Sequence, residues 1–393
     1  MGRDVRFLIF NAQEDASQEL RTSLLQSPRP KLVAEVDEPA MLAQAVQQFH
    51  AAAVLINLDP NPEAILPVIG QISSECPDAA ILATSTSTDG PLILKVMRLG
   101  VKEFLPRPID ADSLTEAIEK VASFRTSVLP EGKLITVMGA SGGVGSTFFA
   151  TNLAVELAAV AEGSVTVVDL DYRFGQVATL LDIEPTYTLS DLCESPEQLE
   201  PQVIDRALVK HSSGVRVLSR PSSFAEADTM TAASCVGLLS TLIQHNEFVI
   251  VDGPCRSDIR ARSVFDIADL NLLIVQLLVP CIRNAARIMS GLREAGEASE
   301  RVMLIPNRVG RHSSDLSIED AAQTLGLEAF ASIPDDWTTV SGAINLGEPL
   351  LAHAPKSKVR MAIEEIAQRL YRPDGQADVE EGKRSLIGRI FAQ

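Results

Sequence analysis

The stretch from residue 134 to residue 161 constrains the fold of this chain more than any other. The apolar run LITVM leads into GASGGVGST and then into the helix-forming sequence FFATNLAVELAAVA. A strand, a glycine-rich turn and a helix in this order wrap backbone N–H groups around a phosphate, and the helix directs its positive dipole end at the anion. A tight turn that binds nothing is the alternative interpretation.

Glycines in this loop permit backbone angles that a side chain would block, and Thr147 occupies the hydroxyl position that ligates magnesium in such loops. The sequence therefore predicts a phosphate-bearing ligand bound together with Mg²⁺. The residues expected to contact the nucleotide here are Ser141, Gly142, Gly143, Val144, Gly145, Ser146, Thr147 and Phe148.

A series of alternating strands and helices continues from this loop. Near-continuous apolar runs predict strands buried on both faces of a parallel sheet, at residues 134–138, 165–169, 248–252, 272–277, 302–306 and 329–333. Asp169 and Asp252 end two of these strands. A carboxylate there faces the crevice in which such sheets bind ligands, although Asp169 could instead cap a turn.

The first 124 residues show the same rhythm on a smaller scale. Short β-rich runs at residues 5–10, 52–58, 80–83 and 103–105 alternate with helix-like stretches such as 18–25 and 113–124. This pattern predicts a small parallel sheet with helices on both faces.

Composition excludes several classes of protein. A net charge of −18 and the lack of a basic run argue against nucleic-acid binding. Five scattered cysteines without a CxxC pair suggest neither a disulfide framework nor a zinc site, which favours a reducing cytoplasm. No signal peptide and no apolar stretch of about 20 residues is present, so we expect a soluble or at most peripheral membrane protein.

The loop and the motifs after it resemble the MinD/ParA family. ASGGVGST followed by ATNLA is similar to that family's deviant phosphate loop, and VVDLD, IVDGP, PNR, IPDD and AINLGEPLL follow in the family's order. The resemblance spans residues 133–370. An amino-terminal receiver-like domain joined to this domain is similar to the CpaE/TadZ proteins of Flp (tight adherence) pilus assembly.

The resemblance implies roles for individual residues. Asp171 corresponds to the catalytic aspartate that orients the attacking water, Asp252 holds magnesium through water, and Asp169 supports the metal region. Asn307 corresponds to the amide that reads adenine, and Pro334 to Asp336 form the loop over the base. Taken from the residues alone, Asn307 could equally be a turn residue.

Three loop positions depart from the family pattern. Ser141 replaces the signature lysine that reaches across a nucleotide-sandwich dimer, Ser146 replaces the general phosphate-loop lysine, and Ala140 replaces the first glycine. Losing one such preorganised group typically costs about 10²- to 10³-fold in rate, so we expect binding with slow or absent hydrolysis. Arg173 or Arg256 could supply the missing charge, or could be an ordinary surface arginine.

The amino-terminal domain resembles a receiver without receiver chemistry. The phosphoacceptor position is Asn57, and Asn11, Ala12 and Gln13 precede the nearest acids, Glu14 and Asp15. Thr84 matches the switch hydroxyl, and Arg107 stands where receivers carry a lysine.

Asp59 is the one other acid near the phosphoacceptor position, and we expect it to cap the loop before Pro60. We predict no phosphorylation and a role for this domain in protein contact or dimerisation.

The carboxy-terminal segment RSLIGRIFAQ places apolar residues at helical spacing between basic ones. These residues are Lys383, Arg384, Leu386, Ile387, Arg389, Ile390 and Phe391. A short basic amphipathic helix can lie at the inner face of the cell membrane, or can dock on a protein.

The sequence thus predicts a flavodoxin-like, receiver-like α/β domain at 1–124, a linker at 125–132, a P-loop NTPase α/β domain of the MinD/ParA kind at 133–372 and a polar tail at 373–393. We expect a cytoplasmic, homodimeric ATP-binding protein that positions pilus-assembly machinery. The alternative is a pseudo-ATPase scaffold that needs no nucleotide. DNA partitioning and phosphoacceptance are disfavoured by the charge and by Asn57.

Overall fold

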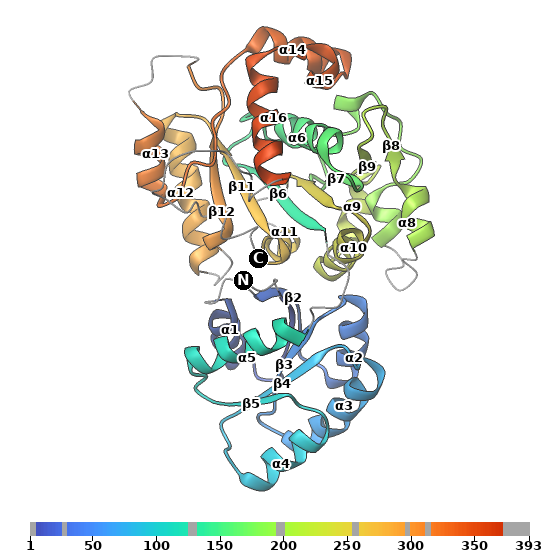
Figure 1. Ribbon diagram of the computed structural model, residues 1–393, viewed down its shortest axis with the longest axis vertical. Helices are drawn as coiled ribbons and strands as arrows, with labels where there is room; N and C mark the ends of the chain where they lie inside the picture. Colours follow the sequence, from blue (N-terminus) through green and yellow to red (C-terminus); the bar gives the residue numbers. More distant parts are fainter. Residues whose placement is uncertain are drawn as a thin grey trace. The chain divides into compact units, whose positions relative to one another are not determined.

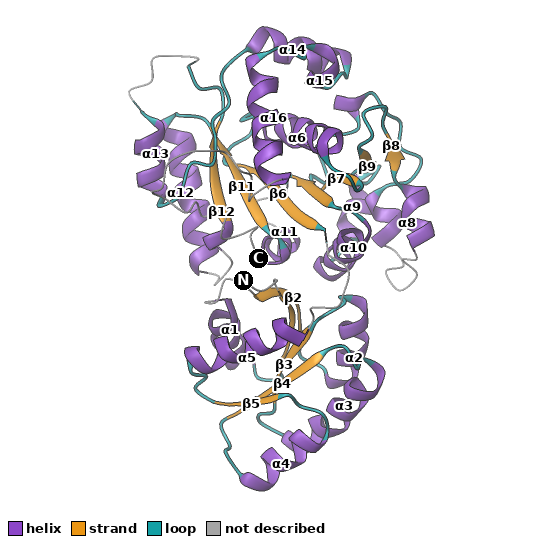
Figure 2. Cartoon of the chain, in the orientation of Figure 1, coloured by secondary structure: helices purple, strands orange, loops and turns teal. Residues whose placement is uncertain are grey.

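The structure is a computed structural model of the 393-residue chain. It describes residues 5–25, 30–124, 132–193, 201–253, 259–294, 299–310 and 316–371. The chain divides into two compact units, the first holding β1 to α5 and the second β6 to α16 (Figures 1 and 2). The predicted tail, Arg256 and most of the predicted linker lie outside the described residues, so those boundaries stay predictions.

The first unit is a five-stranded parallel sheet with the strand order β2-β1-β3-β4-β5. This is the flavodoxin-like order, which confirms the predicted fold class. Every residue of β1 and β3 is buried, as their apolar sequences require. The elements are β1 (Val5–Phe10), α1 (Glu14–Leu25), β2 (Pro30–Val36), α2 (Pro39–Gln48), β3 (Ala53–Asn57), α3 (Pro62–Glu75), β4 (Ala80–Ser85), α4 (Gly90–Arg98), β5 (Glu103–Pro106) and α5 (Ala111–Phe124).

Strand β2 was not predicted from the sequence. It begins at Pro30 and contains Lys31 and Glu35, which break the apolar run that marks the other strands. β2 is an edge strand, paired with β1 alone, and a proline as its first residue is compatible with that position.

The second unit is a seven-stranded sheet with the order β12-β11-β6-β10-β7-β9-β8, parallel except for the β8–β9 pair. Figure 1 shows α6 and α16 on one side of the strands and α10 and α11 on the other. The strands are β6 (Lys133–Gly139), β7 (Val165–Asp169), β8 (Val209–Lys210), β9 (Arg216–Leu218), β10 (Phe248–Asp252), β11 (Leu270–Val275) and β12 (Val302–Pro306). The main helices are α6 (Ser146–Val160), α7 (Leu189–Cys193), α8 (Pro201–Ala207), α9 (Phe224–Thr229), α10 (Ala232–His245), α11 (Ile259–Ile267), α12 (Val279–Glu294), α13 (Ile318–Leu325), α14 (Trp337–Leu346), α15 (Leu350–His353) and α16 (Lys358–Tyr371).

The strand predicted at residues 329–333 is wrong. That segment pairs with β12 and the loop after it through isolated bridges, Leu304 to Ala329 and Val309 to Pro334, and through a hydrogen bond from the Ile333 amide to the Pro306 carbonyl (2.8 Å). Pro306 has no N–H to donate, so the ladder with β12 is interrupted there. The short strands β8 and β9 were not predicted, because two or three residues carry no detectable periodicity.

Helix α6 follows the glycine-rich loop and is buried along most of its length. Two polar side chains on it fix neighbouring elements. Asn152 accepts a hydrogen bond from the Leu350 amide (2.7 Å), and buried Glu156 receives two hydrogen bonds from Arg360 of α16, both 2.8 Å long. The loop-bearing helix is therefore held rigidly against α15 and α16.

No helix among the described residues is long and apolar enough to cross a membrane.

Arg360→Ala would leave the Glu156 carboxylate, which is 2% exposed, without its partner. We expect a loss of about 3–5 kcal/mol in the free energy of unfolding of the second unit. Urea unfolding followed by Trp337 fluorescence measures it, since Trp337 is the one tryptophan in the sequence.

Arg173→Ala is the matched control, because the Arg173–Asp228 pair is exposed (side chains 52% and 60% accessible) and should cost at most about 1 kcal/mol. Equal effects of the two changes would contradict the anchoring role of Glu156.

Candidate functional site

The carboxyl ends of β6, β7 and β10 meet at one edge of the second sheet. Asp252 at the end of β10 lies in register with Asp169 of β7 on one side and with Val137 of β6 on the other. The loop that follows β6 starts at this edge. The parallel register therefore brings two of the predicted acids and the glycine-rich loop together.

Three glycines are required by the shape of this loop. Gly145, the N-cap residue of α6, has φ +95°, and a Cβ there would lie 2.7 Å from the Asn307 Nδ2 atom. A Cβ on Gly139 would lie 2.7 Å from Cγ2 of Val144. The space around Gly142 and Gly143 is open, but Gly143 has a left-handed φ of +73°. The loop can thus present its amides to an anion in front of a 15-residue helix.

Three neutral side chain amides brace the loop. Asn307 donates to the Val144 carbonyl (2.7 Å), Gln276 donates to the Gly143 carbonyl (3.3 Å), and Asn284 of α12 donates to the Ser141 hydroxyl (3.1 Å). Sequence analysis did not identify Gln276 or Asn284, since an isolated amide carries no motif. The loop is held without a cation.

Asp252 is the least satisfied polar group of the site. Its side chain is fully buried, and neither carboxylate oxygen has a hydrogen-bond partner. Burial and then the charge of Asp169 raise the pKa of Asp252 well above its ordinary value. The Thr147 hydroxyl opposes this rise without completing a hydrogen bond to the carboxylate.

Asp169 is buried too, but its oxygens are occupied. They accept hydrogen bonds from the backbone amides of Asp171 (3.2 Å) and Val177 (3.1 Å), so the side chain caps the turn that follows β7. Burial raises the pKa of Asp169 to about 7. The turn-capping role left open by the sequence is therefore present, and a role near a metal stays a prediction.

Asp171 lies beside the same crevice. Its carboxylate accepts a hydrogen bond from the Phe174 amide (3.1 Å), and Gly253 passes so close that a Cβ on it would lie 3.0 Å from Cβ of Asp171. Arg173 points elsewhere: it pairs with Asp228 at 2.7 Å and covers the Phe224 ring. The catalytic role of Asp171 stays a prediction.

Among the residues that the structure describes, no group of three or more His, Cys, Asp or Glu is placed to hold a metal alone. Mg²⁺ needs no such cage, because it usually retains waters and is bound by one or two carboxylates together with substrate phosphates. The two unpartnered oxygens of Asp252, with the Thr147 hydroxyl beside them, fit that kind of site.

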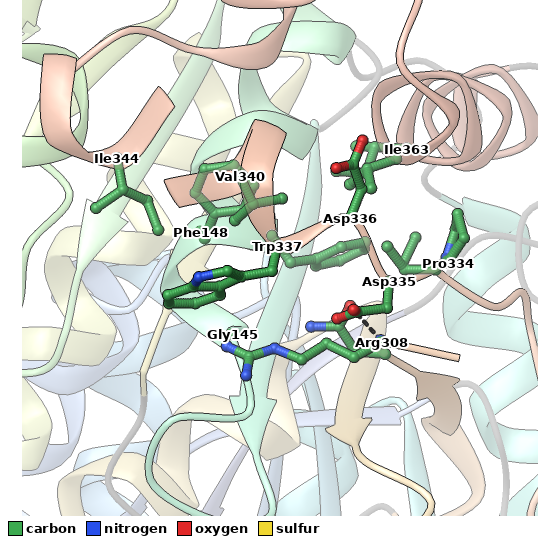
Figure 3. A pocket seen from close by; sticks show the side chains of 14 residues that line it. Gly145, Phe148, Arg308, Pro334, Asp335, Asp336, Trp337, Val340, Ile344 and Ile363 are labelled. Carbon is green, nitrogen blue, oxygen red and sulfur yellow. Dashed lines mark hydrogen bonds between the residues drawn. The ribbon is translucent and has the colours of Figure 1, made fainter. Parts of the chain in front are cut away.

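A pocket opens next to the loop (Figure 3). Its floor is apolar and includes buried Phe149, Ile333 and Ile363, and its lining reaches Gly145 and Asn307. Pro334 and Asp336 also line it, and their contact with a base stays a prediction. The Asp336 carboxylate accepts a hydrogen bond from the Thr339 amide (3.2 Å) and so caps α14.

In the first unit, the place of a phosphoacceptor holds a network of neutral amides. Asn57 is fully buried and donates to Oδ1 of Asn11 (2.8 Å) and to Oε1 of Gln13 (3.4 Å). The Thr84 hydroxyl donates to the Leu105 carbonyl (2.7 Å).

The sequence predicted that Asp59 caps the loop before Pro60, and this prediction is wrong. Its carboxylate accepts hydrogen bonds from the Ser85 hydroxyl (2.7 Å) and the Thr86 amide (2.8 Å) beyond β4. Burial opposes ionisation, but these hydrogen bonds prevail, and with Arg107 they hold the pKa of Asp59 below its ordinary value. Arg107 lies 3.8 Å from Asp59 and pairs with Glu19.

Comparison with known proteins gives a consistent picture of the second unit. Residues 135–350 match the model of the CobQ/CobB/MinD/ParA nucleotide binding domain. The septum site-determining protein MinD of Thermotoga maritima is 28% identical over 61% of this chain and 88% of its own length. The structure of MinD complexed with Mg-ADP from Pyrococcus horikoshii is 22% identical and covers 63% of this chain and 100% of that chain, with a TM-score of 0.54.

The first unit has structural neighbours of its own. A structure described as a candidate pilus assembly protein (cpaE) from Burkholderia thailandensis is 20% identical and covers 30% of this chain and 98% of that chain, with a TM-score of 0.29.

Asp252→Asn should stabilise the metal-free protein. Because the folded-state pKa values of Asp252 and Asp169 are raised, the folded state binds protons more tightly than the unfolded chain. The contribution of these two carboxyl groups to the free energy of unfolding is then present at low pH and is lost as the pH rises through about 7. The substitution removes one buried charge, so we expect a gain of about 1–3 kcal/mol at pH 8 and a shallower pH dependence.

Urea unfolding in EDTA between pH 5 and pH 8 measures this, with Asp228→Asn, an exposed carboxylate, as the control. A less stable Asp252→Asn protein at pH 8 would show that the carboxylate has a partner.

Incubation with acetyl phosphate and Mg²⁺ should leave the protein unmodified, because Asn57 cannot form an acyl phosphate and Asp59 is committed to Ser85 and Thr86. Asn57→Asp should not restore the reaction, since Asn11 and Gln13 supply no acid for the metal. Intact mass spectrometry checks both proteins. An acid-labile phosphate on Asp59 would overturn this expectation.

Proposed function

We propose that this chain, which belongs to the CobQ/CobB/MinD/ParA nucleotide-binding family, binds ATP with Mg²⁺ at the edge of its second sheet and uses the nucleotide as a switch more than as fuel. One observation carries the proposal. The buried Asp252 carboxylate has no partner, and it lies beside Thr147 and a loop shaped to receive an anion.

The amides of residues 141–148 would bind the phosphates, and the Thr147 hydroxyl and the Asp252 carboxylate would hold the magnesium ion, directly or through water. Bound magnesium supplies positive charge that the loop itself lacks. Asp171 would orient a water, and the pocket that Asn307, Pro334 and Asp336 line would receive the base. A relative of known structure is complexed with Mg-ADP, which supports this choice of ligand.

Hydrolysis should be slow or lost. Ser141 and Ser146 stand where the family pattern has lysines, and Arg173 is paired with Asp228. Removing one preorganised group that stabilises transition-state charge typically costs about 10²- to 10³-fold in rate. Binding depends on amides, a helix dipole and a metal, all of which the site can still provide.

The cellular role rests on the sequence resemblance to CpaE/TadZ proteins, which pair a receiver-like domain with a MinD/ParA domain. By that resemblance the protein is cytoplasmic, dimerises when nucleotide is bound and positions Flp pilus-assembly machinery through its partners. The tail that would contact the membrane lies outside the described residues.

A scaffold that needs no nucleotide is the second candidate, and one observation favours it. Asn307, Gln276 and Asn284 already hydrogen-bond the loop, so its shape does not require a ligand. In that case the first unit would carry the function through protein contacts.

Calorimetric titration with ATP, with and without Mg²⁺, separates the two candidates. We expect magnesium-dependent binding that Asp252→Asn weakens at least about tenfold. Gly145→Ala should weaken it similarly, because its Cβ would collide with Asn307 at a left-handed φ.

Gly291→Ala is the matched control. It lies in α12 with nothing within 4 Å of its added Cβ, and binding should be unchanged. If ATP does not bind the wild type with magnesium present, the scaffold is the correct reading.

A further inference from the structure

Two side chains that were not among the predicted site residues, Arg308 and Trp337, line the pocket beside the loop (Figure 3). The guanidinium carbon of Arg308 lies 5.5 Å from the centre of the Trp337 ring, a cation–π contact. Trp337 is 54% exposed, which is unusual for so large an apolar side chain at the first position of a helix.

Arg308 adopts a backbone conformation that its side chain disfavours. Its φ is +56°, in the left-handed region where glycine, asparagine and aspartate are usual. In this conformation the Arg308 backbone amide donates a hydrogen bond to Oδ1 of Asn307 (2.9 Å). Strain of this kind persists where the surroundings enforce it, and it is concentrated at functional sites.

The Arg308 guanidinium forms no ion pair among the described residues, although Asp335 and Asp336 line the same pocket. The adjacent loops are tied together by backbone hydrogen bonds, from the Val309 amide to the Ile333 carbonyl (2.9 Å) and from the Asp335 amide to the Val309 carbonyl (3.0 Å). The segment that carries Arg308 is therefore tied through its backbone to the loop that leads to Trp337, and the Trp337 side chain is exposed.

The pocket is open to solvent, and its volume including that opening is about 510 Å³. Among its lining residues, Trp337 is the exposed aromatic side chain and Arg308 is the cation. A purine that enters the pocket can therefore stack on the indole of Trp337 and meet the guanidinium of Arg308.

The Asn307 side chain, which would hydrogen-bond the edge of a base, already makes hydrogen bonds within the protein. Asn307 donates to the Val144 carbonyl and accepts from the Arg308 amide, so this residue braces the loop as its first task. Binding of a base in this pocket therefore depends chiefly on stacking against Arg308 and Trp337.

We propose that Arg308 and Trp337 form a clamp for the nucleobase, in which the base stacks on the indole and the guanidinium closes over it. The clamp rests on the proposed function, because it presupposes that a nucleotide binds. It also supplies a cation to the lining of the pocket that Gly145 shares, in a site whose phosphate loop has none. Planar rings and guanidinium groups stack favourably on aromatic bases.

The single tryptophan makes the proposal directly measurable. Titrating the full-length protein with Mg²⁺-ATP should change Trp337 fluorescence along the same curve as calorimetric binding. Magnesium tripolyphosphate, which has no base, should leave the fluorescence unchanged.

Substitutions then measure the contribution of each side chain. Trp337→Ala should weaken ATP binding about 5- to 100-fold, the range found for removing a stacking partner, and Trp337→Phe should restore most of it. Arg308→Gly removes the side chain while suiting the left-handed backbone, and should also weaken binding. Leu346→Ala, an equally exposed apolar residue on α14 outside the pocket, is the control.

Two failures are distinguishable. If calorimetry shows that the wild type binds no ATP, the proposed function and the clamp fall together. If ATP binds with unchanged indole fluorescence, and if Trp337→Ala and Arg308→Gly bind within about twofold of Leu346→Ala, the clamp alone is overturned.

Discussion

The buried carboxylate of Asp252 is the constraint on which the account of this molecule depends. Parallel pairing of β10 with β6 and β7 sets Asp252 beside Asp169 at the edge where the glycine-rich loop begins. Asp169 satisfies its oxygens with backbone amides, whereas Asp252 leaves both of its oxygens without a partner. A buried charge of this kind is costly unless something cationic completes it.

The loop next to Asp252 keeps the shape proposed for an anion site although it has no lysine. Its shape comes from glycine at 139 and 145, from the start of α6 and from neutral amides that hold its carbonyls and a hydroxyl. Helix α6 is fixed in turn by the Glu156–Arg360 pair. Binding geometry is thus supported by backbone and packing, while the charge that would drive phosphoryl transfer is missing. The first unit parallels this arrangement, with Asn57, Asn11 and Gln13 in place of acids.

The sequence predicts those strands of the second sheet whose residues are apolar throughout. Strands β7, β10 and β12 matched their apolar runs residue for residue, because strands buried on both faces are uniformly apolar. Strand β2, with its lysine and glutamate, and the bridges near residues 329 and 334 were not predictable, since pairing there is decided by neighbours distant in sequence.

The same distinction holds for the site. The loop, its acids and Arg308 of PNR lie in motifs, while Gln276, Asn284 and Trp337 act through contacts that only the fold creates.

The central claim is that the site keeps nucleotide binding and lacks the charge for hydrolysis. Measuring ATP turnover under saturating Mg²⁺-ATP in the wild type and in Ser146→Lys tests it most directly. The account predicts a wild type that binds ATP with barely detectable turnover and a variant whose turnover rises by about 10²-fold or more. Rapid hydrolysis by the wild type, unchanged by the lysine, would contradict it.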